Sequence, residues 1–311
     1  PYGLVGTSSF YKRESFPGVI KGADNFDGLD AFNTTENNRN SNWNTQGADA
    51  GLYQNSDIWA VRIVSMEPNP DRGYGPHSSP SGGVFYKNAA NERLRILGEI
   101  PLRKFDKDGN PILDPEGNPD TSFLAKIPAD TPFTFQTIDR NGMALNISQT
   151  WHQVRPGEVR HDCGGCHAHS QEPLAFSETA AAKPDYSIWD LTQDTPLVSQ
   201  NQQGEPTLRT ESGPVVNVEF FKDIRPVLQE KCITCHTQNA ENPPANLVLD
   251  DLTMYDGLPG DYKRLCDDRG ADWGIPPLVT VGGNPVWRQT NASRYIRHFQ
   301  SRRSLLMWKL F

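Results

Sequence analysis

Two five-residue motifs carry the residues of this chain that are best suited to chemistry. Residues 163–167 read CGGCH and residues 232–236 read CITCH, which places four of the five cysteines in Cys-x-x-Cys-His order. Thiols at this spacing lie on one side of a short turn, where they can form thioether bonds to the two vinyl groups of a haem while the next histidine binds the iron. The spacing therefore predicts c-type haem at both motifs. The predicted attachment residues are Cys163, Cys166, Cys232 and Cys235, with His167 and His236 as proximal iron ligands.

Two other uses of the cysteines explain less of the pattern. Four thiolates could bind zinc, but the interval between Cys166 and Cys232 is far longer than in zinc ribbons. Local disulfides or redox pairs leave both histidines without a role, as the zinc site does. Cys266, outside the motifs, is predicted to be a buried thiol, with a metal ligand or an intermolecular bridge as less favoured alternatives.

The motifs do not specify the ligand on the opposite side of each iron. For the second haem the candidates are His298, Met254 and Met307, and for the first haem they are His152 and His161; the wider pool also holds His77, Met66 and Met143. His169 is too close to His167 to reach the opposite face of the same iron, which leaves it for an additional metal ion, a haem propionate or the surface. An open first iron could do chemistry, with His161, His169 or Asp162 as acid–base groups.

Composition excludes some functions. The chain has 311 residues and a net charge of −8, so it has no basic field that would attract nucleic acid. No apolar run approaches the length of a transmembrane helix, and the first residues lack the apolar core of a signal peptide. The end, SRRSLLMWKLF, stops inside an apolar, helix-like run. We therefore expect that the chain is a piece of a longer protein or has lost a signal.

The order of patterns along the chain predicts an α+β fold. Residues 1–55 are expected to be dominated by loops, and residues 58–151 to form an antiparallel β region whose turns include Asn141-Gly142. The run DKDGNPILDPEGNPD (106–120) favours a pair of hairpin turns over a calcium-binding loop, because its glycine is misplaced for an EF-hand. Three parts are predicted: a loop-rich β region (1–90), a β-rich domain with the first haem (91–213) and a helical cytochrome c-like domain with the second (214–311).

Two segments connect the motifs to this framework. Residues 177–213 are polar and are predicted to be a connection that ends near residue 213. In VEFFKDIRPVLQEKCITCH (218–236), the spacing of Val218, Phe221, Ile224 and Leu228 predicts one buried helical face, with a kink at Pro226. A last helix is predicted from Ala292.

Both motif regions resemble a known family. The run 127–170, which ends in CGGCHAHS, resembles the middle region of hydrazine synthase alpha-subunit-like multihaem proteins, and residues 218–236 with NLVLDDL (246–252) resemble the cytochrome c-like domain of that family. The resemblance implies that residues 1–90 are the end of a β-propeller. It also implies a tyrosine as iron ligand four residues after the first motif histidine; here that position is Gln171, which favours ligation by His167 and casts doubt on hydrazine synthesis.

Three functions follow as hypotheses. The favoured one is a dihaem cytochrome that transfers electrons between redox protein partners, or further copies of itself in an oligomer, rather than an enzyme. The alternative is a haem enzyme related to hydrazine synthase or to dihaem peroxidases, with an open first haem. A third is a binding module whose haems only stabilise a loop-rich fold. Because c-type haem in this family is attached outside the cytoplasm, a periplasmic or extracellular location is expected.

Overall fold

The computed structural model describes residues 1–11, 55–67, 93–148, 151–162, 172–212, 218–255, 258–266, 279–281, 284–286, 295–296, 301 and 306–307. Contacts divide the chain into two compact units. The first holds nearly all described residues up to 212, and the second holds those from 218 onward. The division into three parts at residues 90 and 213 stays a prediction.

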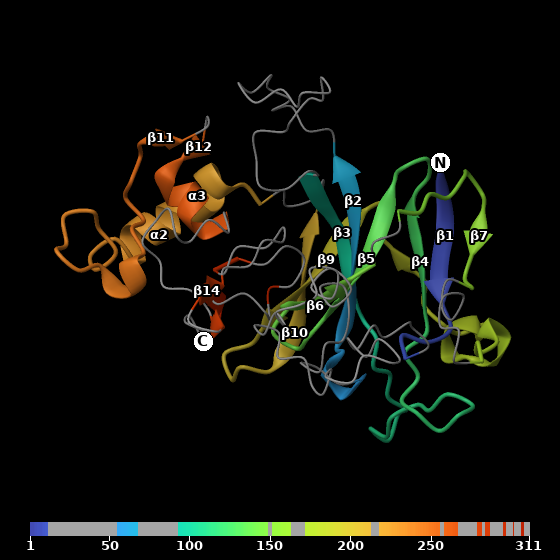
Figure 1. The fold of residues 1–311 in the computed structure, drawn as a ribbon. Coiled ribbons are helices and arrows are strands. Elements are labelled where there is room, and N and C mark those ends of the chain that lie inside the picture. The colour runs from blue at the N-terminus through green and yellow to red at the C-terminus, as the bar shows by residue number, and fades with distance from the viewer. Residues whose placement is uncertain are drawn as a thin grey trace. The chain divides into compact units, whose positions relative to one another are not determined.

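The first unit is built from β-strands, as the patterns predicted for residues 58–151 (Figure 1). One four-stranded sheet has the order β7-β1-β4-β8, and another has the order β3-β2-β5-β6. The strands are β1 (Tyr2–Thr7), β2 (Ala60–Glu67), β3 (Arg93–Pro101), β4 (Phe123–Pro128), β5 (Phe133–Ile138), β6 (Ala144–Ile147), β7 (Val159–Arg160) and β8 (Trp189–Asp190). β2 and β6 both pair antiparallel with β5, which confirms the predicted antiparallel arrangement.

One apolar core joins both sheets. Along β4, residues Phe123, Ala125 and Ile127 alternate with less buried residues, so one face of the strand is buried. Phe123 packs edge-to-face on Phe135 of β5, with ring centroids 6.2 Å apart. The same core includes residues of β1, β2, β3 and β6.

The expectation that residues 1–55 are dominated by loops is wrong at its start, because β1 lies in the middle of a sheet. β1 pairs along its full length with β4, from Tyr2 opposite Pro128 to Thr7 opposite Phe123. Gly3 and Gly6 interrupt the alternation of apolar and polar residues by which a strand is recognised in a sequence. A Cβ on Gly6 would lie 2.4 Å from the Phe123 carbonyl oxygen, so the close approach of these strands excludes a side chain there.

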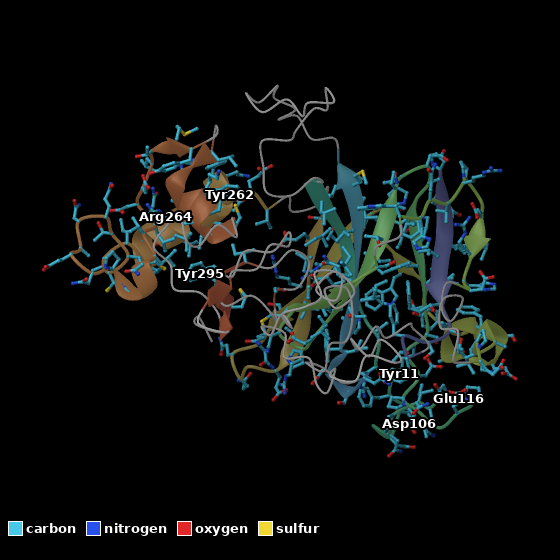
Figure 2. The ribbon with its side chains drawn as sticks, viewed as in Figure 1. Tyr11, Asp106, Glu116, Tyr262, Arg264 and Tyr295 are labelled. Carbon is cyan, nitrogen blue, oxygen red and sulfur yellow. The ribbon has the colours of Figure 1, made fainter. Side chains whose placement is uncertain are left out.

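Four turns of the first unit share one construction. Each begins at an Asp or Asn whose side-chain oxygen accepts hydrogen bonds from the second and fourth following backbone N–H groups, and each has a glycine with positive φ at the fourth position. The turns start at Asp106, Asp114, Asp139 and Asn201. The first two confirm the predicted pair of hairpin turns, and Figure 2 shows Asp106 and Glu116 on this projecting segment. The third confirms the Asn141-Gly142 turn.

Residues 177–212 are not a mere polar connection, so that prediction is wrong. They form two short helices, η2 (Phe176–Glu178) and η3 (Ala180–Ala182), then β8 and the hairpin of β9 (Asp194–Gln200) and β10 (Pro206–Ser212). Leu191 and Leu197 are buried. The segment reads as polar because β10 is largely exposed and only a short apolar run in β9 faces the interior.

A buried ionic cluster holds this segment to the sheet. The Asp120 carboxylate accepts hydrogen bonds from Lys104 Nζ at 3.0 Å, from the Ser122 hydroxyl and from the Ala180 backbone N–H at 2.8 Å. Burial favours the neutral carboxyl, but the Ala180 N–H, the Lys104 charge and the Ser122 hydroxyl outweigh it, so the pKa of Asp120 lies below its ordinary value.

The second unit contains short helices and short strands, drawn in orange and red in Figure 1. Its elements are η4 (Phe220–Ile224, a π-helical turn), α2 (Arg225–Lys231), η5 (Pro244–Asn246), β11 (Met254–Tyr255), β12 (Leu258–Pro259), α3 (Gly260–Cys266), β13 (Val279–Val281) and β14 (Asn284–Val286). The described chain is therefore β-rich with few helices. The propeller remnant and the cytochrome c-like domain stay predictions, and most of the helix predicted from Ala292 lies outside the described residues, although Tyr295 and Ile296 lie in a bend.

Gly142→Ala should destabilise the first unit by about 1–2 kcal/mol, because an L-residue at φ 77° is strained. The nearest side-chain atom to the added Cβ, in Val198, would be 3.9 Å away, so a steric clash adds nothing. Gly142→Asn is the matched control, since asparagine tolerates this conformation better. Urea unfolding measures both; equal losses in the two variants would contradict a backbone origin.

Asp120→Asn should cost about 3 kcal/mol at neutral pH, because it leaves Lys104 without its counter-charge. Since the pKa of Asp120 is lower in the folded chain, its contribution is complete above the ordinary carboxyl pKa of about 3.9 and is lost as pH falls through the folded value. Between about pH 4 and pH 2 the free energy of unfolding should therefore fall less steeply in the variant. Urea unfolding at several pH values tests this, with the exposed Asp185→Asn as control; parallel slopes for wild type and Asp120→Asn would contradict it.

Candidate functional site

The second Cys-x-x-Cys-His motif follows directly on helix α2. The π-helical turn η4 precedes that helix, with the Ile224 N–H bonded to the Glu219 carbonyl at 3.3 Å, five residues back. Pro226 lies in the first turn of α2, where its missing N–H breaks no helical hydrogen bond. The proline fits the first turn of α2, and the predicted kink at Pro226 stays a prediction.

The predicted buried face of this helix is wrong, except at Leu228. Val218, Phe221 and Ile224 are exposed, whereas Leu228 is buried. The wider π turn shifts the register, so that Phe220 rather than Phe221 packs on the core of the second unit. A sequence read with a uniform 3.6-residue period could not anticipate this shift.

The CITCH motif forms a compact turn that could hold a porphyrin by its edge. The backbone N–H groups of Cys235 and His236 both donate to the Cys232 carbonyl, at 3.2 and 3.0 Å. Cys232 is half-buried, Cys235 is exposed, and no disulfide joins them. Both thiols are thus available on one turn, as covalent attachment requires.

The His236 ring is oriented by a backbone carbonyl. Its Nδ1 atom lies 2.9 Å from the Leu247 carbonyl oxygen. A carbonyl oxygen can only accept, so Nδ1 carries a proton, and in the neutral ring Nε2 then has the lone pair. A hydrogen bond of this kind at the other ring nitrogen is the usual support of a metal-binding histidine. The residues at this motif therefore fit an iron-bound haem.

An apolar cluster surrounds the base of the motif. Leu228 of α2 packs with Leu247, Leu249 and Leu265, and Tyr295 completes the buried set. Cys232 and Ile233 from the motif itself pack against this cluster. The carbonyl that orients His236 therefore belongs to a segment anchored by buried leucines on both sides.

Two ionic contacts fix helix α3, which carries Tyr262 and Arg264 (Figure 2). Arg225 at the start of α2 forms an ion pair with the buried Asp261: a terminal guanidinium N–H donates to the carboxylate at 2.8 Å, and Nε lies 2.7 Å from its other oxygen. Arg264 donates to Asp251 at 2.8 Å. Burial favours the neutral form of Asp251, but bonds from Arg264, the Thr253 N–H and the Tyr255 hydroxyl lower its pKa below the ordinary value.

The first motif, with Cys163, Cys166 and His167, lies outside the described residues, as do His169, Gln171, His77 and His298. His152 is backbone-paired with Phe133, and its ring lies 5.8 Å from the rings of Phe133 and Phe135. His161 stacks on Phe176 with ring centroids 4.4 Å apart, and its Nδ1 is buried without a hydrogen-bond partner among the described residues. Asp162 is exposed.

The methionine candidates differ in exposure. Met254 lies on β11 with 60% of its surface exposed, whereas Met66, Met143 and Met307 are half-buried. Cys266, predicted to be buried, is only half-buried at the end of α3. All distal ligand assignments stay predictions.

The sequence reading missed the residues that support His236. These are Leu247 through its carbonyl group, Asn246 with a left-handed backbone of φ 54°, and Asp250, which contacts the residues after the motif. A backbone acceptor has no sequence signature. The aspartate offered a weak signal, because an acidic side chain directly after the apolar run Leu247–Leu249 needs a partner.

The described residues contain neither a metal-binding cluster nor a membrane-spanning helix. In the part of the chain that the structure describes, no group of three or more histidine, cysteine, aspartate or glutamate side chains is placed to hold a metal ion, and the additional metal near His169 stays a prediction. Among the same residues, no helix is long and apolar enough to cross a membrane.

Comparisons with known proteins agree on one family. Residues 56–168 match the family model of the hydrazine synthase alpha subunit middle domain. The curated hydrazine synthase subunit alpha of Kuenenia stuttgartiensis is 27% identical over 301 residues, which cover 82% of this chain and 33% of that protein. The chain thus spans about a third of the length of this relative.

A solved structure supports the same relationship at the level of the fold. The structure of Kuenenia stuttgartiensis hydrazine synthase matches with a TM-score of 0.57 at 18% identity, covering 99% of this chain and 37% of that chain. The match to the family model, residues 56–168, includes the first motif at residues 163–167. Over these regions the chain is similar to the hydrazine synthase alpha subunit.

Proposed function

We propose that this chain is a dihaem c-type cytochrome, related to the hydrazine synthase alpha subunit, that transfers electrons between redox partners outside the cytoplasm. The hydrogen bond between His236 Nδ1 and the Leu247 carbonyl carries this proposal, because it leaves Nε2 ready to bind iron beside two unpaired thiols. The relative's name as a subunit supports assembly with protein partners or further copies of the chain.

The residues of the second motif would act as a fixed holder. Cys232 and Cys235 would anchor the porphyrin edge, and His236 would supply the proximal ligand in a set orientation. The buried leucines around the motif would exclude water from that side of the ring. Bound haem supplies reversible one-electron chemistry, and the chain's contribution is to bind it, orient the axial histidine and limit its solvation.

A second candidate is a haem enzyme related to hydrazine synthase, favoured by the match to that enzyme's alpha subunit. His161 would be its acid–base group, because stacking on Phe176 holds the ring two residues before the first motif. Gln171 cannot supply the phenolate ligand that the family resemblance implies at that position. Any such enzyme would therefore work with a different ligand set at its first iron.

The purified chain, produced with c-type haem maturation, should carry two covalent haems by intact mass and by pyridine haemochrome absorbance. Changing Cys232 and Cys235 together to Ala should remove one haem, and changing Cys163 and Cys166 should remove the other. Cys266→Ser, outside both motifs, should retain two. Intact mass counts the haems even if a variant is unstable. Absence of covalent haem from the wild-type chain would contradict the proposal.

Carbon monoxide separates the two candidate functions. If both irons are closed by two protein ligands, the spectrum of the reduced chain should stay low-spin and unchanged under carbon monoxide, as an electron carrier requires. Binding to about half of the haem, abolished in the Cys163→Ala, Cys166→Ala variant, would show an open first iron and replace the electron-transfer proposal with the enzyme.

A further inference from the structure

A loop of the second unit is closed directly behind the motif histidine. The His236 carbonyl accepts a hydrogen bond from the Leu249 N–H at 2.8 Å. The Asp250 carboxylate accepts from the Thr237 hydroxyl and, at 2.7 Å, from the Gln238 N–H. These bonds join the two ends of the loop 237–250 and tie the motif to the segment after Asn246.

The direction of the Leu247 carbonyl is set inside this loop. A tight turn brings the Asn246 N–H to the Pro243 carbonyl at 2.8 Å, and Asn246 takes a left-handed backbone with φ 54°. Asparagine accepts this conformation more readily than most residues. The next residue, Leu247, is buried, and its carbonyl meets His236 Nδ1 at 2.9 Å.

We propose that Thr237, Asp250 and Asn246 are positioning residues that set the strength of the His236–Leu247 hydrogen bond and, through it, the reduction potential of the haem at this motif. The proposal rests on haem binding as proposed above. A firm hydrogen bond at Nδ1 makes the imidazole a better electron donor at Nε2 and favours oxidised iron. None of the three residues would touch the haem iron; each acts through the carbonyl.

The competing view is that these bonds only stabilise the loop. In that case, weakening them would lower the free energy of unfolding without changing the potential of the folded chain. Thr237→Val removes the hydroxyl with little change in shape, and Thr237→Ser keeps it, so the pair isolates the two bonds of this hydroxyl, which donates to Asp250 and accepts from the Asn239 N–H at 3.2 Å. Asn246→Val and Asn246→Gly form a second pair, because valine disfavours and glycine favours the left-handed backbone.

Spectroelectrochemical titration of the full dihaem chain tests the proposal, with the potential of the other haem as an internal reference. Thr237→Val and Asn246→Val should raise the potential of the second haem by about 59 mV, a tenfold change in its one-electron equilibrium. Thr237→Ser and Asn246→Gly should stay near wild type. Unchanged potentials in both valine variants, at full haem content, would overturn the positioning role.

A readout in the haem-free chain separates this failure from failure of the proposed function. The ¹⁵N shifts of the His236 ring report which nitrogen carries the proton. The wild type should show the Nδ1–H tautomer, and Thr237→Val and Asn246→Val should show a mixture of tautomers. The same tautomer population in all variants would overturn the inference even if the chain proved to bind no haem. Absence of haem with the expected tautomer shift would overturn only the proposed function.

Discussion

The first unit depends on one buried carboxylate. Glu99 of β3 is 3% exposed, and a carboxylate that deep must be matched by donors. Arg62 of β2 supplies one at 2.5 Å, and the Val198 N–H of β9 supplies the other. Arg62 also donates hydrogen bonds to the Gln136 side chain and to the Gly142 carbonyl. This one charge pair therefore connects strands β2, β3 and β5 with the β5–β6 turn and the β9–β10 hairpin. Loss of either partner would leave an uncompensated buried charge, at a cost of about 3–5 kcal/mol.

The second unit, which has a smaller apolar core, also contains buried carboxylates paired with arginines. Asp261 and Asp251 are both buried, and each is matched by an arginine, Arg225 and Arg264. A Cβ on Gly260 would lie 2.5 Å from the Asp251 carboxylate, so the start of α3 approaches this cluster as closely as a backbone can. Such pairs add little net stability, but they penalise every arrangement that separates them. They therefore define where α3 lies relative to α2 and the motif that follows it.

Local chemistry was predictable from the sequence, and long-range pairing was not. The turns at Asp106, Asp114 and Asp139 were readable because an Asx residue and a glycine three residues later specify the turn without outside help. Strand β1 was missed because its glycines are explained only by the neighbouring β4. The register of the helix before CITCH was missed for a related reason: the π turn inserts one residue, and no periodic pattern contains that information.

The candidate site divides in the same way. Cysteine and histidine spacing predicts haem attachment at both motifs, since thioether chemistry depends on positions close in sequence. The acceptor for His236 is a main-chain carbonyl eleven residues away, and only the closed loop 237–250 brings it there. On the proposed function, attachment is thus a local property of each motif, whereas the potential and the openness of each iron depend on distant segments. Two relatives could therefore share both motifs and differ in the segments that set the potential and the openness of each iron.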